Sequence, residues 1–468
     1  MSDGPAKYTP PGKGGKPSKV ERVGGEVAAI VDRLNEDHAF VLAGADAVIL
    51  REGTDAWGRP EVRFVKVGAF KLLHGTHFVD TGKRDLQTWA EVWLESPLRR
   101  EYLGVCLAPD GAPESYYNLW RGFDVEPKAG DVALWEKHVY GVLADGNKAA
   151  GDYIMAWYAD IAQHPGQKCE TALVFRGDEG SGKTLPGKIV GSLFPAHYSL
   201  IDDPRYVTGN FNQHMENCIL LQVDEGFWAG DKQAEGRLKG LVTSDVHYIE
   251  RKNVDAYKVR NLIRLQVTSN NDWVIPAGYG SRRWAVFDVA STHVREREYF
   301  GPLVAWGESV EGRAALLHYL LNFDLGMVDL KAIPDTEALY EQRISTMPDE
   351  DAWWLSRLKA GAILPSQDDW VCEVPTEALW ESYVKFAEKI GVKRKRVETQ
   401  LAIALRRRLL PKGWPKSSRI SVDHTDERGV TTWRRLPHYV FPPLEECRRH
   451  FQEKLSGHAI DWGDDGPS

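Results

Sequence analysis

Short apolar runs alternate with helix-like segments through the middle of the chain. The runs are TALVF (171–175), CILLQV (218–223), LIRLQVT (262–268) and WAVFDV (284–289), and helical patterns separate them. A mostly parallel sheet covered by helices requires this alternation. The pattern therefore predicts an α/β core in the middle of the chain.

The residues on either side of these runs follow other patterns. Gly, Pro, Lys and Ser dominate the first residues of the chain. A segment of this composition buries too little apolar surface to offset the conformational entropy that is lost on folding. Short apolar runs separated by polar turns come next, and helix-like segments follow them. The predicted domains are a disordered tail (1–22), a small strand-rich module (23–84), a helical region preceding the core (85–165), the core (166–295), a helical lid and connector (296–350) and a C-terminal domain (351–468).

Composition narrows the classes of function. The chain of 468 residues has 59 Lys+Arg and 67 Asp+Glu, and its net charge of -8 argues against coating nucleic acid through bulk charge. The five cysteines lack metal-ligand spacing, so neither a disulfide framework nor a zinc module is predicted. Because we find neither a signal peptide nor a long apolar run, we expect a cytoplasmic protein with no membrane partner.

The segment GDEGSGKT (177–184) fits the pattern GxxxxGK[ST] between a predicted strand and a predicted helix. In such a loop, backbone N–H groups surround the phosphates of a nucleotide. Lys183 can reach the outer phosphates and Thr184 can bind Mg²⁺, so ATP and Mg²⁺ are the predicted cofactors. Pro186 is tolerable only in the first helical turn. The predicted nucleotide-binding residues are Gly177, Asp178, Glu179, Gly180, Ser181, Gly182, Lys183 and Thr184.

Two adjacent carboxylates, Asp224 and Glu225, directly follow the apolar run CILLQV. In this position Asp224 can hold the Mg²⁺ ion together with Thr184, and Glu225 can orient and deprotonate an attacking water. The alternative is a strand that ends in a solvated acidic turn. Beside the GDEGSGKT loop, the pair favours hydrolysis of ATP over binding alone.

Polar residues also border the next two apolar runs. Asn270 lies at the end of one, where its amide can contact the outer phosphate and position water. Arg282 and Arg283 precede the other, and an arginine at a rim can act across a subunit boundary on the transferring phosphate. The alternatives are a simple asparagine turn and a solvated arginine pair.

The order of these segments resembles the superfamily-3 helicases of viruses, phages and plasmids, which are AAA+ ring ATPases. The resemblance rests on GDEGSGKT, LLQVDE, LKGLVTSDVHYIERKNVDAYKVRN and LIRLQVTSNN followed by SRRW. It implies an AAA+ P-loop core in a homo-oligomeric ring, with six subunits expected. It also implies that Lys183 and Thr184 are Walker A residues, Asp224 and Glu225 the Walker B pair, Asn270 the first sensor, and Arg283 the finger beside Arg282.

The resemblance further implies that HYIERKNVDAYKVRN forms a β-hairpin that grips one DNA strand. Its predicted DNA contacts are Arg251, Lys252, Asn253 and Lys258, because cationic tips suit backbone phosphates. A charged surface hairpin without function is the alternative. The region before the core resembles phage and plasmid primase-helicases, but the segment before Asp85 is too short for a primase, so no primase activity is expected.

The C-terminal domain is locally basic. From Gly391 to Arg435 there are thirteen Lys/Arg and four Asp/Glu, a balance of 13 - 4 = +9. Helices followed by a predicted two-stranded wing around residues 426–429 resemble a winged-helix module that docks on DNA. A solvated basic face, or a site for a protein partner, remains the alternative.

These patterns together predict an ATP-hydrolysing, ring-forming DNA helicase or translocase of phage or mobile-element replication in the cytoplasm of a bacterial host. Its expected partners are single-stranded DNA, forked or origin duplex DNA, and a separate primase or polymerase. The first alternative is a nucleotide-switched initiator or loader that remodels origin DNA without translocation. A metabolic P-loop kinase is less favoured, because it needs neither the tandem carboxylates nor the arginine pair.

Overall fold

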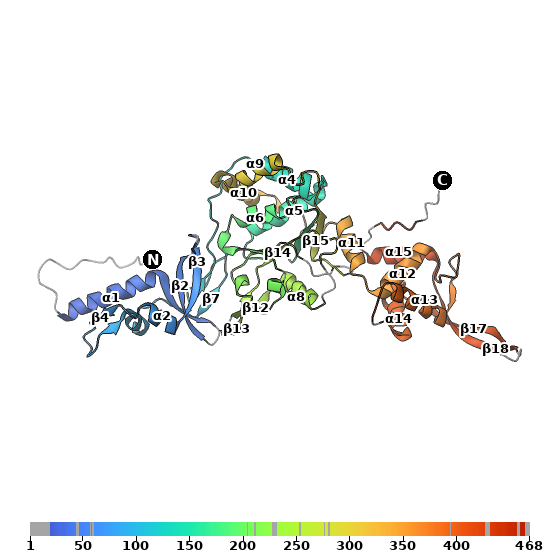
Figure 1. Ribbon diagram of the computed structural model, residues 1–468, viewed down its shortest axis with the longest axis horizontal. Coiled ribbons are helices and arrows are strands. Elements are labelled where there is room, and N and C mark those ends of the chain that lie inside the picture. The colour runs from blue at the N-terminus through green and yellow to red at the C-terminus, as the bar shows by residue number, and fades with distance from the viewer. Residues whose placement is uncertain are drawn as a thin grey trace, which may run out of the picture. The chain divides into compact units, whose positions relative to one another are not determined.

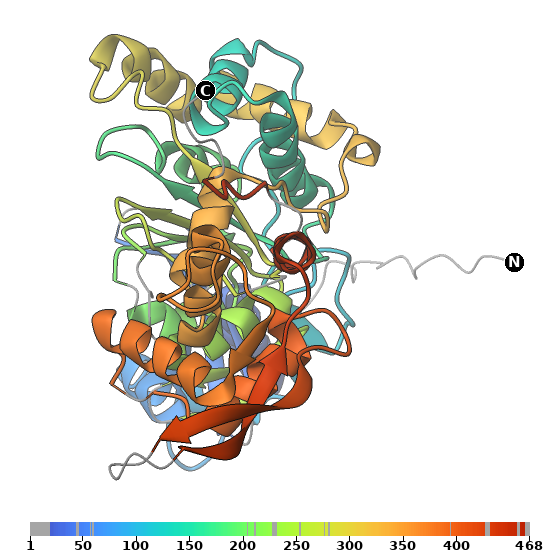
Figure 2. The same cartoon turned by 90° about the vertical axis from the view of Figure 1, so that its right-hand side faces the viewer.

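The structure is a computed structural model that describes residues 19–43, 46–56, 58, 60–203, 205–209, 212–226, 232–251, 254–275, 277–278, 281–393, 395–425, 431–455 and 459–463. Tertiary contacts divide the chain into two compact units. Unit 1 comprises residues 1–122, 210–218 and 246–261, and unit 2 comprises residues 123–209, 219–245 and 262–468. Figures 1 and 2 show the helices and strands of both units from two directions.

Unit 1 packs helices against one face of a small sheet with strand order β3-β2-β1-β6. Its core includes Ile30, Ile49, Phe70 and Trp93, which come from separate elements. Helix α1 begins at Lys19, inside the segment expected to be a tail, and its residues Ile30, Val31 and Leu34 pack into this core. The elements are α1 (Lys19–Asp37), β1 (His38–Ala43), β2 (Asp46–Thr54), β3 (Pro60–Lys66), α2 (Val67–Leu73), β4 (Phe78–Val79), β5 (Gln87–Thr88), α3 (Trp89–Glu95), β6 (Glu101–Tyr102), β7 (Gly104–Cys106) and β8 (Tyr116–Asn118).

The predicted hairpin of HYIERKNVDAYKVRN is found in unit 1. Strands β12 (Val246–Arg251) and β13 (Val254–Arg260) pair antiparallel. Asn212, just before the short helix η3 (Gln213–Met215), donates to the carbonyl of Tyr248 at 2.8 Å and accepts from the backbone N–H of Glu250 at 2.8 Å. This amide fixes the first strand of the hairpin to the unit.

Unit 2 is built on a five-stranded sheet with the order β10-β11-β14-β9-β15, and every neighbouring pair of strands is parallel. The four predicted apolar runs form β9 (Ala172–Arg176), β11 (Leu220–Val223), β14 (Arg264–Ser269) and β15 (Trp284–Asp288). Strand β10 (Tyr198–Ile201) was not predicted, because this edge strand is only partly buried and its sequence, YSLI, has no long apolar run.

Helices cover the sheet of unit 2, and Figure 1 shows α8 on the side opposite α5 and α6. On the α5 side, Tyr158 donates to Gln266 Oε1 at 2.7 Å, and Gln222 donates to the carbonyl of Thr184 at 2.8 Å. Pro186 lies in the first turn of α6, as predicted. The helices are α4 (Ala133–His138), η1 (Val139–Leu143), α5 (Lys148–Gln163), α6 (Leu185–Gly191), η2 (Pro195–His197), α7 (Arg205–Thr208), α8 (Lys232–Thr243), α9 (Arg297–Glu308), α10 (Val310–Asn322) and η4 (Leu325–Met327).

Arg176 is the last residue of β9, and its side chain is buried. The guanidinium pairs with Asp288 at the end of β15 and with Glu341 of α11 (Glu337–Ser345). One cation therefore joins two adjacent strands and a helix directly before the GDEGSGKT loop.

The last part of unit 2 forms a second core around aromatic residues that include Trp353, Trp354, Tyr383 and Phe441. Its three-stranded sheet has the order β16-β18-β17. The prediction of a winged-helix-like domain rests on this order of elements, and the turn at residues 426–429 lies outside the described residues. The elements are α12 (Asp349–Ala360), β16 (Glu373–Pro375), α13 (Thr376–Lys389), α14 (Glu398–Ala404), η5 (Leu405–Leu409), β17 (Lys416–Thr425), β18 (Thr431–Val440) and α15 (Leu444–Lys454).

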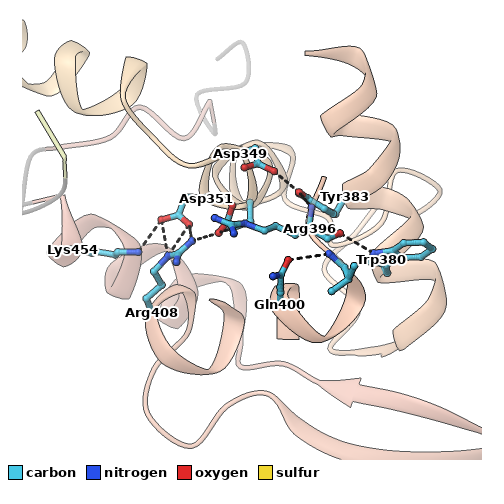
Figure 3. A network of polar contacts seen from close by, with 10 residues as sticks. Asp349, Asp351, Trp380, Tyr383, Arg396, Gln400, Arg408 and Lys454 are labelled. Atoms are coloured by element: carbon cyan, nitrogen blue, oxygen red, sulfur yellow. Dashed lines mark hydrogen bonds and ion pairs between the residues drawn. The ribbon is translucent and has the colours of Figure 1, made fainter. Parts of the chain in front are cut away.

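Buried carboxylates tie three helices of this C-terminal part together (Figure 3). Asp351 of α12 is fully buried and accepts from Arg408 of η5 at 2.5 Å and from Lys454 of α15 at 3.1 Å. Arg408 also contacts Glu350 at 2.6 Å. Because a buried carboxylate is costly without partners, this network fixes η5 against α12 and α15.

We expect the buried pair between Asp160 of α5 and Arg264 of β14 to be essential to the stability of unit 2. The Arg264 side chain is fully buried and donates to Asp160 Oδ2 at 2.8 Å. Asp160→Ala leaves a cation in the interior, so urea denaturation should show a loss of about 3–5 kcal/mol. Lys148→Ala removes an exposed pair with Asp152 and is the control, with an expected loss below about 1 kcal/mol. Equal losses in the two variants would contradict this assignment.

Candidate functional site

The GDEGSGKT loop lies at the carboxyl end of β9, in unit 2. Gly180 and Gly182 have φ values of 86° and 89°, which other residues rarely adopt. A Cβ at Gly180 would lie 2.7 Å from Cγ of Arg295, and one at Gly182 would overlap the ring of Phe300. Glycine is therefore required at both positions, because each has a positive φ and leaves no space for a Cβ atom.

Lys183 is 5% exposed and points along the loop. Its amine donates to the carbonyl of Asp178 at 3.1 Å and to Oδ1 of Asn270. Burial lowers the pKa of Lys183 below its ordinary value, and the charges of Glu225 and Asp224 oppose this shift. The amine is thus held by neutral acceptors and nearby carboxylates, in a position where phosphate oxygens could replace the acceptors.

The two predicted Mg²⁺ ligands are brought together. Thr184 Oγ1 donates to Asp224 Oδ1 at 3.0 Å, so the end of the loop meets the end of β11. Thr268 of β14, which sequence reasoning missed, donates to the same carboxylate oxygen. A hydroxyl and a carboxylate are hard oxygen ligands of the kind that Mg²⁺ prefers, so these residues fit the predicted ion.

Glu225 and Asn270 complete the same cluster. Nδ2 of Asn270 donates to Oε1 of Glu225 at 2.7 Å, while Oδ1 of Asn270 accepts from Lys183. Glu225 has φ 54°, an uncommon conformation for a residue other than glycine. The predicted residues Lys183, Thr184, Asp224, Glu225 and Asn270 therefore meet at one edge of the sheet.

Arg282 and Arg283 do not join this cluster within the chain. The carbonyl of Arg283 accepts from the backbone N–H of Ala172 at 2.7 Å, which places both arginines at the amino end of β9. The loop with Lys183 follows the opposite end of the same strand. Their role as a finger across a subunit boundary stays a prediction.

The predicted DNA contacts lie on the hairpin of unit 1. Lys258 of β13 is exposed and pairs with Tyr248 of β12, whose side chain is 62% exposed. Arg251 ends β12, but Lys252 and Asn253 lie outside the described residues. The contact of this hairpin with DNA stays a prediction.

A cavity of about 400 Å³ opens beside the loop and extends along α9. Arg295 donates its backbone N–H to the carbonyl of Gly180 at 3.0 Å, and Phe300 lines the same cavity. Sequence reasoning missed both residues, because nothing near them in the chain distinguishes them from other arginines and aromatic residues. The cavity gives space for a ligand next to Lys183.

His138, the last residue of α4, contacts the backbone of the loop at Gly182. Sequence reasoning missed this residue as well. The side chain is fully buried, with Nε2 lying 3.3 Å from the carbonyl of Gly182 and Nδ1 lying 3.3 Å from the hydroxyl of Tyr299. Burial lowers the pKa of His138 to about 4. The neutral ring therefore links the loop to α9 at ordinary pH. A single buried histidine in an apolar helix carries no sequence signal for this role.

Two features are absent from the described residues. No helix among them is long and apolar enough to cross a membrane. In the same ranges, no group of three or more His, Cys, Asp or Glu side chains is arranged to hold a metal ion.

Comparisons with known proteins identify relatives of part or most of the chain. A family described as a family of unknown function (DUF5906) matches residues 175–283. A DNA primase-polymerase of Nitratiruptor phage NrS-1 is 24% identical over 211 residues, which are 42% of this chain and 29% of that protein. The apo structure of the NrS-1 C-terminal region (305–718) covers 88% of this chain and 98% of that chain, with TM-score 0.60 and 16% identity. A second apo form has TM-score 0.58 and 15% identity.

These relatives correct the function predicted from the sequence. The chain is similar to a phage protein named for priming and polymerisation, so the predicted ATP-hydrolysing, ring-forming helicase is wrong, together with its initiator alternative. The same name contradicts the expectation that primase activity is absent. The physical reason is that a phosphate-binding loop with adjacent carboxylates suits any enzyme that uses a nucleoside triphosphate with Mg²⁺, whether the enzyme hydrolyses the nucleotide or polymerises it. The resemblance holds in its coarser part, similarity to a phage replication protein.

We expect His138 to make the stability of unit 2 depend on pH. Its folded pKa of about 4 lies below the ordinary value of 6.5, so its stabilising contribution is complete above pH 6.5 and is lost as pH falls towards 4. Urea denaturation should show about 2 kcal/mol more loss between pH 7 and pH 5 in the natural protein than in His138→Gln, which cannot titrate. Parallel pH profiles would contradict the assignment.

Proposed function

We propose that this chain takes part in phage DNA priming and polymerisation, and that its contribution is to bind a nucleoside triphosphate with Mg²⁺. The observation that carries the proposal is the meeting of Lys183, Thr184 and Asp224 at the carboxyl end of a parallel sheet. Ligands of α/β sheets bind at this edge. The phage primase-polymerase to which the chain is similar supports the replication context.

We assign the residues of the site separate roles according to their charge. The amine of Lys183 and the backbone N–H groups of the loop would neutralise and orient the phosphates. Thr184 and Asp224 would hold Mg²⁺, which would supply positive charge next to the phosphates. Asn270 connects the amine to Glu225, so the position of Lys183 depends on both.

We also propose two parts of the architecture, one supported by the order of the strands and one by the order of the C-terminal elements. Strand β9 lies between β14, which ends beside Asn270, and β15. This order supports an AAA+ P-loop core, and the order of elements after residue 350 supports a winged-helix-like domain. Both remain proposals about the fold, and neither assigns a helicase activity. DNA is the proposed partner.

Lys183→Ala should weaken binding of a fluorescent triphosphate analogue in the presence of Mg²⁺ by about 10- to 100-fold. The loss corresponds to the roughly 1.5–3 kcal/mol of a hydrogen bond to a charged group. Lys331→Ala, an exposed lysine in a loop, is the matched control and should bind like the natural protein. Asp224→Asn should reduce the gain in affinity that Mg²⁺ gives. Unchanged affinity of Lys183→Ala would refute the nucleotide site.

Primer synthesis tests the wider part of the proposal. With a single-stranded DNA template, Mg²⁺, ribonucleotides and deoxyribonucleotides, we expect labelled products whose yield falls in Lys183→Ala. The fall is expected because the site must hold the triphosphate before it can support synthesis. A natural protein that binds the triphosphate but forms no product would reject the role in priming and leave the binding site intact.

A further inference from the structure

The hairpin of β17 and β18 presents an unusual face to solvent. The two strands pair over their whole length, with Arg419 opposite Pro437 and Ser421 opposite Arg435. Figure 1 shows the hairpin extending from the C-terminal helices. Because alternate residues of a strand point to the same face and direct partners share it, Arg419, Trp433 and Arg435 belong to one face. We call these three residues the hairpin face.

All three residues of the hairpin face are exposed. Trp433 is 73% exposed, although tryptophan has a large apolar surface that is normally covered. Its neighbour on this face, Arg435, is two residues further along the strand, or about 6.6 Å away. Trp433 thus presents a large aromatic surface to water beside an arginine of the same face, and it does not belong to the core of this domain.

A further arginine extends the hairpin face at its base. Nη2 of Arg406 donates to Ser417 Oγ at 3.3 Å, and the guanidinium lies 5.7 Å from the ring centre of Tyr439. Ser417 and Tyr439 are direct partners in the hairpin. Arg408, two residues after Arg406, is instead held in the buried network of Asp351 (Figure 3). The basic run of η5 therefore contributes one arginine to the ion pairs of the buried carboxylates and one to the hairpin face.

We propose that the hairpin face binds single-stranded nucleic acid. Arginines contact the phosphates, and Trp433 stacks on a base, which is the combination that recognises single strands with little dependence on sequence. In a duplex the flat faces of the bases are already stacked on one another, so an exposed indole would have no base face to contact. On the hairpin face the two strands contribute two arginines, Arg419 and Arg435, and one acidic residue, Asp423, which is the direct partner of Trp433.

The test measures binding of a fluorescein-labelled oligothymidylate to the full chain by anisotropy, without nucleotide. Trp433→Ala should weaken binding roughly 5- to 100-fold, the range for loss of one base stack, and Trp433→Phe should restore most of it. Arg419→Ala combined with Arg435→Ala should reduce the slope of log affinity against log salt by about 1.4, or about 0.7 for each phosphate contact.

Two exposed positions serve as controls. Leu436→Ala changes the residue that follows Arg435 in β18 and belongs to the other face of the hairpin. Arg449→Ala removes an exposed arginine of α15. Both should bind the oligonucleotide like the natural protein. The proposal is overturned if Trp433→Ala and the double arginine variant also bind normally. It is equally overturned if a labelled duplex of the same length binds as tightly as the single strand and depends on the same residues.

Discussion

A buried ammonium group needs acceptors or opposite charge nearby, and this requirement organises the site around Lys183. Its acceptors come from the loop itself and from the end of β14, while the nearest carboxylates follow β11. These strands must therefore be parallel neighbours with their ends level, which is what the register shows. The amine can be held in this position only if the backbone of the loop turns tightly, and this explains the glycines of the loop.

Much of this arrangement could be predicted from the sequence. Buried parallel strands require long apolar runs, and residues that follow such runs meet at one edge of the sheet, so Lys183, Asp224 and Asn270 could be grouped in advance. Thr268 was missed although it ends the apolar run two residues before Asn270, because we considered only the residues that follow the run. His138 could not be grouped with the site, because it lies in a helix before the core and no sequence pattern marks it. Strand β10 was not predicted either, because an edge strand buries less apolar surface than a central strand and therefore has a weaker apolar pattern.

The error in function has a physical cause as well. A triphosphate and Mg²⁺ demand the same loop, hydroxyl and carboxylate whether the nucleotide is hydrolysed, transferred or simply held. The residues near Lys183 therefore support the proposed ligand but do not distinguish between these reactions. The C-terminal part shows a similar limit, because the run RRR is uniform in sequence, while in the structure Arg408 pairs with the buried Asp351 and Arg406 lies beside the hairpin.

The ion pairs of Arg176 constrain the backbone at the start of the GDEGSGKT loop. It is the last residue before the loop, and its guanidinium is shared between a carboxylate of β15 and one of α11. The residue that precedes the loop is therefore constrained by two elements far from it in the sequence, and a change in the loop backbone would have to begin after Arg176 or be accompanied by a shift of β15 or α11. Arg176 thus anchors the start of the loop to α11, the helix that leads along the chain towards the C-terminal elements.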